Sequence, residues 1–223
     1  MMALPGARML FERRGPKLPY DAEVEYLEST GTQLIDTGVH GRDNLLVGAR
    51  FAIASIPLSG SQYVFIGAYG RSFIGVMLQG STGNFRFAAI SSLYGAAVPI
   101  DTEVHDVLID SSSGSKRVLF DDVEIASSAG SFSGEYTETV ALFGRIGYAN
   151  GCQARLYSFA VNDASTGDLI QSLFPVRFTN EQGVSEGAMY DRVSGQLFRN
   201  GGTGAFVIGP DKTANSDGEG INV

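Results

Sequence analysis

Short stretches in which apolar and polar residues alternate recur along most of this chain. Near the start, Val24 and Tyr26 alternate with two glutamates, and a period of two places successive side chains on opposite faces of a strand. The turn-forming cluster STGT at 29–32 follows, and residues 33–39 resume the apolar pattern. The pattern predicts two short strands joined by a turn, at the point where an N-terminal arm gives way to a β domain.

The rest of the chain repeats this arrangement, with Gly, Ser, Asn and Pro between the apolar segments. Three strands within 103–125 have links so short that they must be antiparallel neighbours, because parallel pairing needs a long crossover. Asp121-Asp122 forms the tight turn between the last two of these strands. The further strands that we expect are 45–56, 62–68, 73–79, 85–90, 103–110, 116–120, 123–125, 139–143, 154–161, 169–176, 188–191, 196–199 and 205–208.

No helix is expected, because no window of about 11 residues keeps apolar positions at helical spacing. About a dozen strands without helices are typical of a sandwich or a barrel. We therefore predict an all-β fold, a two-sheet antiparallel β-sandwich of the jelly-roll kind. Two local details belong to this prediction: the strand 169–176 ends near Pro175, and residues 39–44 (VHGRDN) form a polar loop.

The composition is that of a β domain with a real core. The chain has 223 residues, of which 43% are hydrophobic and only 18% charged, and it contains 29 glycines. Many glycines and few charges suit short strands joined by tight turns. The expected division is an N-terminal attachment arm at 1–22, a β-sandwich domain at 23–209 and a polar C-terminal tail at 210–223.

The charge and the apolar runs exclude several partners and locations. A net charge of −8 argues against nonspecific nucleic-acid binding and against docking on an anionic membrane surface. No run approaches the roughly 20 apolar residues of a membrane helix. The N-terminus lacks the continuous apolar core of a signal peptide, so we expect a protein that stays in the cytoplasm where it is made unless it leaves by assembly into a larger particle.

The N-terminal arm is basic on an otherwise acidic protein. It is either a disordered leader or an attachment arm that becomes ordered on a partner. The attachment interpretation assigns partner binding to its cationic residues and to one aromatic residue, namely Arg8, Phe11, Arg13, Arg14 and Lys17.

Three segments of the chain are similar to those of a known family. Residues 25–39 (EYLESTGTQLIDTGV), 156–163 (LYSFAVND) and 187–210 (GAMYDRVSGQLFRNGGTGAFVIGP) resemble, in the same order, blocks of the concanavalin A-like (laminin-G-like) jelly-roll proteins encoded by phages and prophages of gut bacteria. Residues 119–125 (LFDDVEI) also resemble a hairpin of that family, with Asp121-Asp122 in place of the more usual Asp-Gly. The resemblance implies a two-sheet antiparallel sandwich, a lectin-like surface and a virion or surface-exposed setting. It implies no catalysis.

Carboxylate pairs are the first candidates for catalysis, because a glycosidase needs two of them across a cleft. The nearest pairs in the sequence are Glu23 with Glu25, and Asp122 with Glu124. Neither pair reproduces the alternating acid signature of the glucanases that share this fold. Solvated carboxylates on a strand face and at a turn explain both pairs, so we expect no enzymatic activity, and a glucanase-type hydrolase is the least favoured function.

The remaining nucleophiles and bases are few. A serine triad needs a histidine as base, and the two histidines, His40 and His105, lie far from any nucleophile-elbow motif. Cys152 is the only cysteine, which excludes a disulfide within the chain and a Cys/His metal cluster. It is interpreted as a small buried hydrophobe rather than a reactive thiol.

Several aspartates raise the question of a calcium site, which needs converging oxygen ligands. Hairpin turns are naturally rich in aspartate, so we interpret these residues as turn residues and predict no metal and no cofactor. The residues concerned are Asp101, Asp106, Asp110, Asp121 and Asp122.

A glycine-rich loop at 144–151 (GRIGYANG) is the best candidate for a binding site. It lacks the sequence of a phosphate loop, and it is either a plain connection or part of a sugar-binding rim in which aromatic rings stack on a pyranose. Loops on a rigid sandwich commonly carry binding residues. The candidate rim consists of Tyr69, Arg71, Tyr94, Arg145, Tyr148 and Asn150.

These observations favour a non-enzymatic structural or accessory protein of a phage virion, with a lectin-like sandwich anchored by the arm. Its partners would be other virion proteins of the capsid or tail, and homo-oligomers are expected because virion appendages are symmetric. The alternative is a carbohydrate-binding module that attaches to cell-surface or mucosal glycans.

Overall fold

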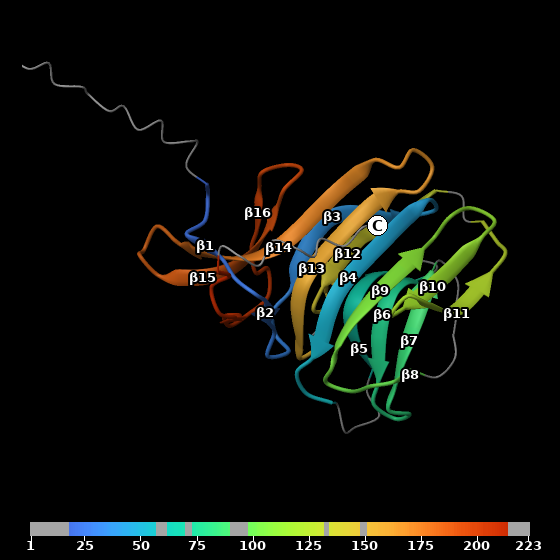
Figure 1. Ribbon diagram of the computed structural model, residues 1–223, viewed down its shortest axis with the longest axis horizontal. Coiled ribbons are helices and arrows are strands. Elements are labelled where there is room, and N and C mark those ends of the chain that lie inside the picture. The colour runs from blue at the N-terminus through green and yellow to red at the C-terminus, as the bar shows by residue number, and fades with distance from the viewer. Residues whose placement is uncertain are drawn as a thin grey trace, which may run out of the picture.

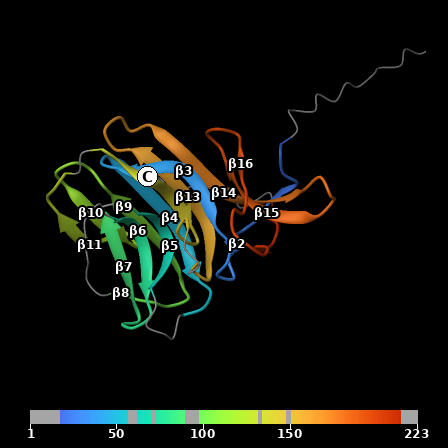
Figure 2. The same ribbon diagram turned by 180° about the vertical axis from the view of Figure 1, so that it is seen from behind.

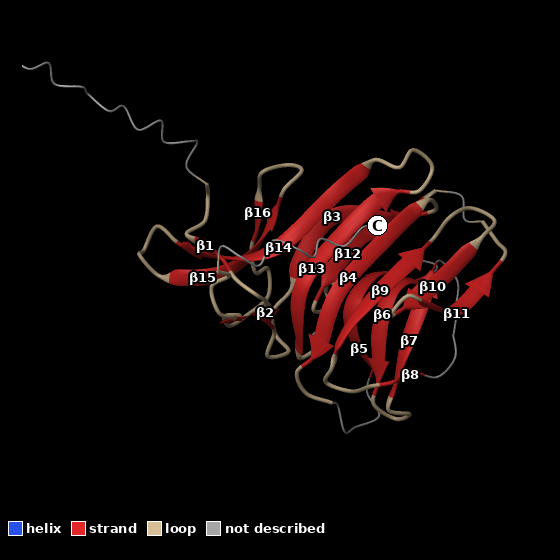
Figure 3. Ribbon diagram, viewed as in Figure 1, coloured by secondary structure: helices blue, strands red, loops and turns tan. Residues whose placement is uncertain are grey.

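Two antiparallel β-sheets face each other in the computed structural model (Figure 1). The structure describes residues 18–56, 62–69, 73–89, 98–131, 134–147 and 151–213. Figure 3 draws strands and loops but no helix over this part of the chain, which accordingly has no helix long and apolar enough to cross a membrane. The predicted all-β class and two-sheet antiparallel sandwich are confirmed.

The larger sheet has eleven strands. Three short strands lie off the main path: β1 (Ala22–Glu23) pairs with β14, and β2 (Leu27–Glu28) pairs with both β13 and β17 (Val207–Ile208). The main order across the sheet is β11 (Val123–Ser128), β10 (Lys116–Phe120), β9 (Val104–Asp110), β4 (Leu45–Ile53), β13 (Ala154–Asp163), β14 (Leu169–Thr179), β15 (Ser185–Asp191) and β16 (Leu197–Phe198).

The smaller sheet has six strands, and the core lies between the two sheets. Phe51 of the larger sheet and Phe65 of the smaller sheet are fully buried, with ring centroids 4.7 Å apart. The order across the smaller sheet is β3 (Ile35–Arg42), β12 (Glu135–Leu142), β5 (Gln62–Tyr69), β6 (Phe73–Gln79), β7 (Asn84–Ala89) and β8 (Val98–Pro99).

The predicted run of neighbouring strands in 103–125 is confirmed as β9, β10 and β11, each antiparallel to the next. Asp121 and Asp122 both have positive φ, at 48° and 64°. Positive φ at both central residues is the geometry of a type I′ turn, whose twist matches that of a two-residue hairpin. The hairpin therefore keeps the usual turn although aspartate replaces glycine.

Strand β14 continues through Pro175 to Thr179, so the predicted end near Pro175 is wrong. Strand β13 pairs with β14 only as far as Leu173, and on the same side the N–H of Val24 then donates to the Pro175 carbonyl at 3.0 Å. The proline nitrogen lies at the junction between these two partners. Because no ladder hydrogen bond is required there, proline is tolerated within the strand.

The predicted loop at 39–44 is also wrong, because β3 extends to Arg42. His40 lies opposite Thr139 of β12, and its Nδ1 is 2.9 Å from the Tyr136 carbonyl oxygen. Polar residues can occupy this strand because every second side chain points away from the core. Conversely, residues 33 and 34, predicted to be strand, precede β3 and make other contacts.

The end of the described chain is fixed on its beginning. Asp211 forms a bridge with Val24, and the Lys212 N–H donates to the Glu23 carbonyl at 2.9 Å. Part of the predicted polar tail therefore pairs with the N-terminal segment, and residues 214–223 lie outside the described residues.

Candidate functional site

The conspicuous STGTQ turn at 29–33 is held by its own last residue. The Gln33 side-chain oxygen accepts hydrogen bonds from the Thr30 N–H at 2.8 Å and the Ser29 hydroxyl at 3.0 Å. The Gln33 amide nitrogen donates to the Ala205 carbonyl at 2.9 Å. Gln33 is 2% exposed, so this one buried amide satisfies the polar groups of the turn and ties it to the far end of the chain.

A second set of bonds joins the same turn to residues 200–204. The Thr32 hydroxyl donates to the Thr203 carbonyl at 2.8 Å, and the Thr203 N–H donates back to the Thr32 carbonyl at 2.9 Å. A Cβ at Gly202 would lie 2.2 Å from the Thr32 carbonyl oxygen, a distance that only glycine avoids. The first and last of the three family-like segments therefore contact each other.

The turn also supports the chain just before β13. A Cβ at Gly151 would lie 2.6 Å from the Gly31 carbonyl oxygen, and a Cβ at Gly31 would be in van der Waals contact with the Gln153 side chain, at 3.5 Å. The Ser29 N–H donates to the Ala154 carbonyl at 2.9 Å. Residues 151–154 thus lie directly on the turn.

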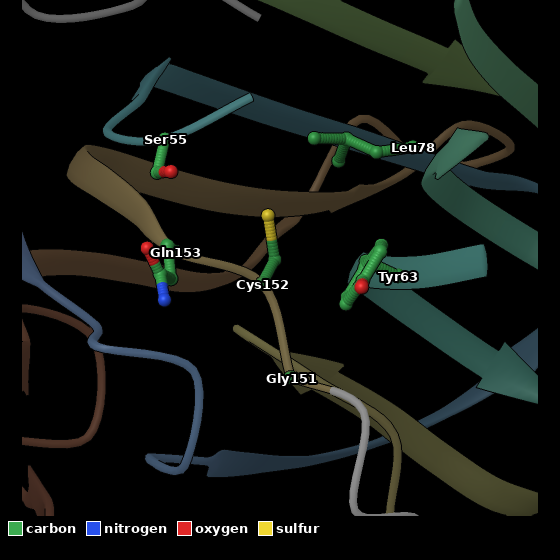
Figure 4. Close-up of a pocket in the computed structure, with 6 residues that line it drawn as sticks. All are labelled: Ser55, Tyr63, Leu78, Gly151, Cys152 and Gln153. Carbon is green, nitrogen blue, oxygen red and sulfur yellow. The ribbon is translucent and has the colours of Figure 1, made fainter. Parts of the chain in front are cut away.

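A pocket of about 110 Å³ opens beside this supported segment (Figure 4). It lies at the end of the sandwich where β4 ends and β13 begins, and both sheets contribute to it. Figure 4 shows the Cys152 sulfur pointing into the space between Ser55 and Leu78. The lining residues are Ser55, Tyr63, Leu78, Gly151, Cys152 and Gln153.

The pocket has an apolar floor and a polar rim. Leu78 and Cys152 are buried, and burial raises the pKa of the Cys152 thiol, so this sulfur stays protonated and is a weakly polar wall rather than a nucleophile. Ser55 and Gln153 are exposed, and their side chains make no hydrogen bond within the described part of the chain. None of the described residues that line the pocket is charged.

The wall behind Cys152 contains a strained residue. Phe143 is fully buried and has a φ of 66°, which is a sparsely populated conformation for a bulky side chain. Its N–H donates to the Phe65 carbonyl at 2.6 Å, and its own carbonyl accepts from the Cys152 N–H at 2.8 Å. Backbone strain of this kind is concentrated at ligand sites, and here it lies at the base of the glycine-rich loop.

Of the six predicted rim residues, only Arg145 has a described side chain. Its guanidinium binds both Glu138 carboxylate oxygens, with nitrogen–oxygen distances of 3.1 and 2.9 Å. Tyr69 ends β5, and its side chain lies outside the described set. Also outside the described residues are Arg71, Tyr94, Tyr148 and Asn150.

Sequence reasoning missed the pocket residues themselves. Ser55 follows β4, Tyr63 and Leu78 belong to β5 and β6, and Gln153 precedes β13. Nothing in their local sequence distinguishes them from other residues at strand ends. The glycine-rich loop 144–151 is the one signal that pointed to this region, because Gly151 ends it and lines the pocket.

His105, expected to be an ordinary strand residue, lies between two carboxylates. Its Nδ1 is 2.7 Å from an Asp121 oxygen and its Nε2 is 2.7 Å from an Asp101 oxygen, while its ring packs on Phe120 at 4.5 Å between centroids. Two nitrogen–carboxylate bonds require two N–H donors, so the ring is an imidazolium. Burial lowers the His105 pKa, but the bonds to both carboxylates outweigh it and the net pKa is raised.

The other candidate carboxylates are in ordinary structural pairs. Asp110 accepts from Arg117 at 3.0 Å, and Asp106 from Arg50 at 3.3 Å. The Glu23 carboxylate accepts from the Tyr20 hydroxyl at 3.3 Å. Within the described ranges, no three His, Cys, Asp or Glu side chains are grouped so as to hold a metal ion.

The arm residues Arg8, Phe11, Arg13, Arg14 and Lys17 lie outside the described residues. The chain that follows them is docked on the outer face of β14 and β15. The Tyr20 ring meets Phe174 and Tyr190 edge-on, with centroids 6.0 and 5.0 Å apart. Burial, with Glu23 nearby, raises the pKa of Tyr20 to about 12.

The function has to be inferred from this geometry, because the comparisons with known proteins give no match. No protein-family model matches the chain, and a search of curated proteins finds no match either. The pocket and the docked N-terminal segment are therefore the two features from which function is inferred.

Proposed function

We propose that the protein is a non-enzymatic attachment module of a phage virion, a β-sandwich that is held on the particle by its N-terminal arm. The observation that carries the proposal is the docking of Tyr20, which fixes the point where the arm leaves the domain. Next to it, the Asp21 N–H donates to the Arg177 carbonyl at 2.8 Å and β1 pairs with β14. An arm can hold the domain at a defined place on the particle only if it joins the domain at such a rigid point.

The placement of this point suits a displayed domain. In Figures 1 and 2, β15 and β16, beside which β1 lies, are at one end of the molecule, and β10 and β11 are at the other. An arm bound to a particle would leave this far end facing outward. Its four cationic residues within 1–17 against one Glu12 favour an acidic partner surface.

Particle incorporation tests the attachment. Virions are assembled with the full chain, with a chain lacking residues 1–17, or with Tyr20→Ala, and the protein on purified particles is counted by electron microscopy and gel densitometry. Loss of the truncated chain from particles, with reduced occupancy for Tyr20→Ala, is expected. Normal incorporation of the truncated chain refutes the anchoring role. An unchanged melting temperature of the truncated chain confirms that the domain itself is intact.

The pocket favours a second function, binding of carbohydrate. It combines an apolar floor with exposed hydroxyl and amide groups, as small-ligand sites do, and it adjoins the glycine-rich loop. A glycan array and calorimetry at millimolar sugar test this. Gln153→Ala should abolish the binding, and Gln182→Ala, an exposed glutamine in the turn between β14 and β15, is the matched control. Binding that survives Gln153→Ala would place the sugar elsewhere.

A further inference from the structure

Strand β11 forms one edge of the larger sheet. Among the described strands it pairs only with β10, so the backbone groups on its other side face no strand. Natural proteins commonly block such an edge with lysine, proline or a very short strand, whereas β11 has six residues and contains neither lysine nor proline. One extra residue at Ile125 bends the ladder locally. The rest of the edge is open to pairing with a further strand.

The side of β11 that faces the core is apolar and partly uncovered. Val123 lies opposite the buried Phe120 on β10, yet it is 62% exposed because the sheet ends beside it. Ile125 and Ala126 are only partly buried and pack against the edge of the core. A further strand with apolar side chains would cover Val123, and removing that surface from water is favourable.

The turn end of β11 is acidic. Asp122 and Glu124 are exposed, and neither is part of an ion pair within the described part of the chain. The neighbouring Asp121 differs, because its carboxylate is held by His105 at 2.7 Å. A strand that pairs with β11 should therefore combine apolar residues for Val123 with cationic residues for the two free carboxylates.

This chain itself contains a segment of that composition. Residues 8–14 (RMLFERR) place three apolar residues between Arg8 and the pair Arg13-Arg14. No other stretch of seven residues in the sequence has three cationic side chains. The segment belongs to the N-terminal arm, which lies outside the described residues.

The arm is too short to supply this segment to β11 of its own copy. Tyr20 is docked on Phe174 of β14 and Tyr190 of β15. A strand added beyond β11 would lie six strand spacings from β14, roughly 29 Å along the sheet. Arg14 precedes Tyr20 by six residues, which span at most about 21 Å when fully extended. Figures 1 and 2 likewise show β15 and β11 at opposite ends of the molecule.

We propose that residues 8–14 of one copy add as a strand to β11 of a second copy, with apolar side chains on Val123 and arginines on Asp122 and Glu124. The inference rests on the proposed attachment role of the arm and names the surface that the arm binds. Because arm and edge lie at opposite ends, copies join head to tail. Such a contact either closes into a ring or continues as a chain.

Sedimentation of the full chain tests the association. Between about 1 μM and about 1 mM protein, at low salt, the mean mass should rise with concentration. Raising the salt to about 0.5 M should weaken the association severalfold, because the contact pairs exposed charges.

Two variants of the full chain separate the arm from the edge. The arm variant carries Arg13→Ser with Arg14→Ser, and the edge variant carries Val123→Lys with Glu124→Lys at two exposed positions. Each should be monomeric alone. An equal mixture should form a dimer and nothing larger, because one intact arm meets one intact edge. Glu181→Lys, which reverses an exposed carboxylate outside β11, is the matched control and should associate as the unsubstituted chain does. Unchanged melting temperatures confirm that the variants are folded.

The outcomes distinguish this inference from the attachment role. A full chain that stays monomeric overturns the inference, and the attachment role still stands if particle incorporation requires the arm. If neither association nor incorporation requires the arm, both fail. Association of the arm variant alone refutes the arm as the occupant, and association of the edge variant alone refutes β11 as the site. A mixture that stays monomeric, or that grows beyond a dimer, refutes the head-to-tail arrangement.

Discussion

The His105 cluster leads to a specific prediction about stability and pH. The imidazolium links Asp101, which lies between β8 of the smaller sheet and β9 of the larger, to Asp121 in the turn between β10 and β11. It thus fastens the corner where the chain passes from one sheet to the other. Replacing His105 with glutamine, which has a similar length but no charge, keeps at most one of the two bonds.

The magnitude follows from the two contacts. A hydrogen bond to a charged group contributes about 1.5–3 kcal/mol in a protein. The Asp101 and Asp121 side chains are 49% and 48% exposed, and solvent screening reduces their contribution to the lower end of that range or below. The pair of bonds should therefore stabilise the fold by roughly 2 kcal/mol in total, and His105→Gln should cost about 1–2 kcal/mol near pH 6.

The sign of the pH dependence is fixed by the raised pKa. The folded protein holds the His105 proton more tightly than the unfolded chain does, whose ordinary pKa is 6.5. The stabilisation is complete below pH 6.5 and is lost as the pH rises through the folded pKa. Between the two pKa values the free energy of unfolding should fall by about 1.4 kcal/mol per pH unit.

Urea unfolding from about pH 6 to about pH 8 measures this slope. Among the described groups with a clearly displaced pKa, only His105 titrates in this window, since the aspartates titrate lower and the tyrosines and Cys152 titrate higher even in the unfolded chain. His40→Gln, the other histidine, is the matched control and should retain the slope. An equal slope in His105→Gln and in the unsubstituted protein would refute the assignment.

Two further substitutions test how the sandwich is held together, and chemical denaturation measures both. Lys116→Met removes a buried ion pair, in which the Lys116 ammonium lies 2.6 Å from the Asp43 carboxylate, and should cost about 3 kcal/mol, most of which Asp43→Leu in the same chain restores. If the double variant is as unstable as the single one, loss of this ion pair is not the cause. Gly202→Ala forces a Cβ against the Thr32 carbonyl oxygen and should cost about 2 kcal/mol or more. In Gly201→Ala the new Cβ would lie 3.7 Å from its nearest neighbour, the Leu34 carbonyl oxygen, so this control should change stability by less than about 1 kcal/mol. Equal effects of the two alanines would contradict the steric argument.

The strands could be predicted from the sequence because the signal for a half-buried strand is local. The alternation in β9 and the short links to β10 and β11 specify both the strands and their pairing, as the structure confirms. The errors arise where a distant partner decides. Pro175 stays within β14 because the segment that contains β1, about 150 residues earlier in the chain, replaces β13 beside it. Nothing in the sequence near Pro175 indicates this pairing.

The site was less predictable than the strands, for the same reason. Gln153 and Ser55 become neighbours only because β13 pairs with β4, which brings the residues flanking the two strands to one end of the sheet. His105 lies within the predicted strand 103–110, but its two carboxylates come from a link and a turn whose positions depend on the packed sheets. Residue types predict which chemistry is available, and tertiary structure decides which groups meet.

The most recognisable stretch of the sequence, residues 25–39, is therefore a support and not a site. The side chains that make it recognisable, Thr32 and Gln33, bind residues 200–205, and a ligand could reach them only by breaking those bonds. Gln153, which rests on the same turn, has an exposed amide without such a partner. Chains that share this stretch are accordingly expected to share the sandwich, whereas their ligands should differ with the residues at Ser55 and Gln153.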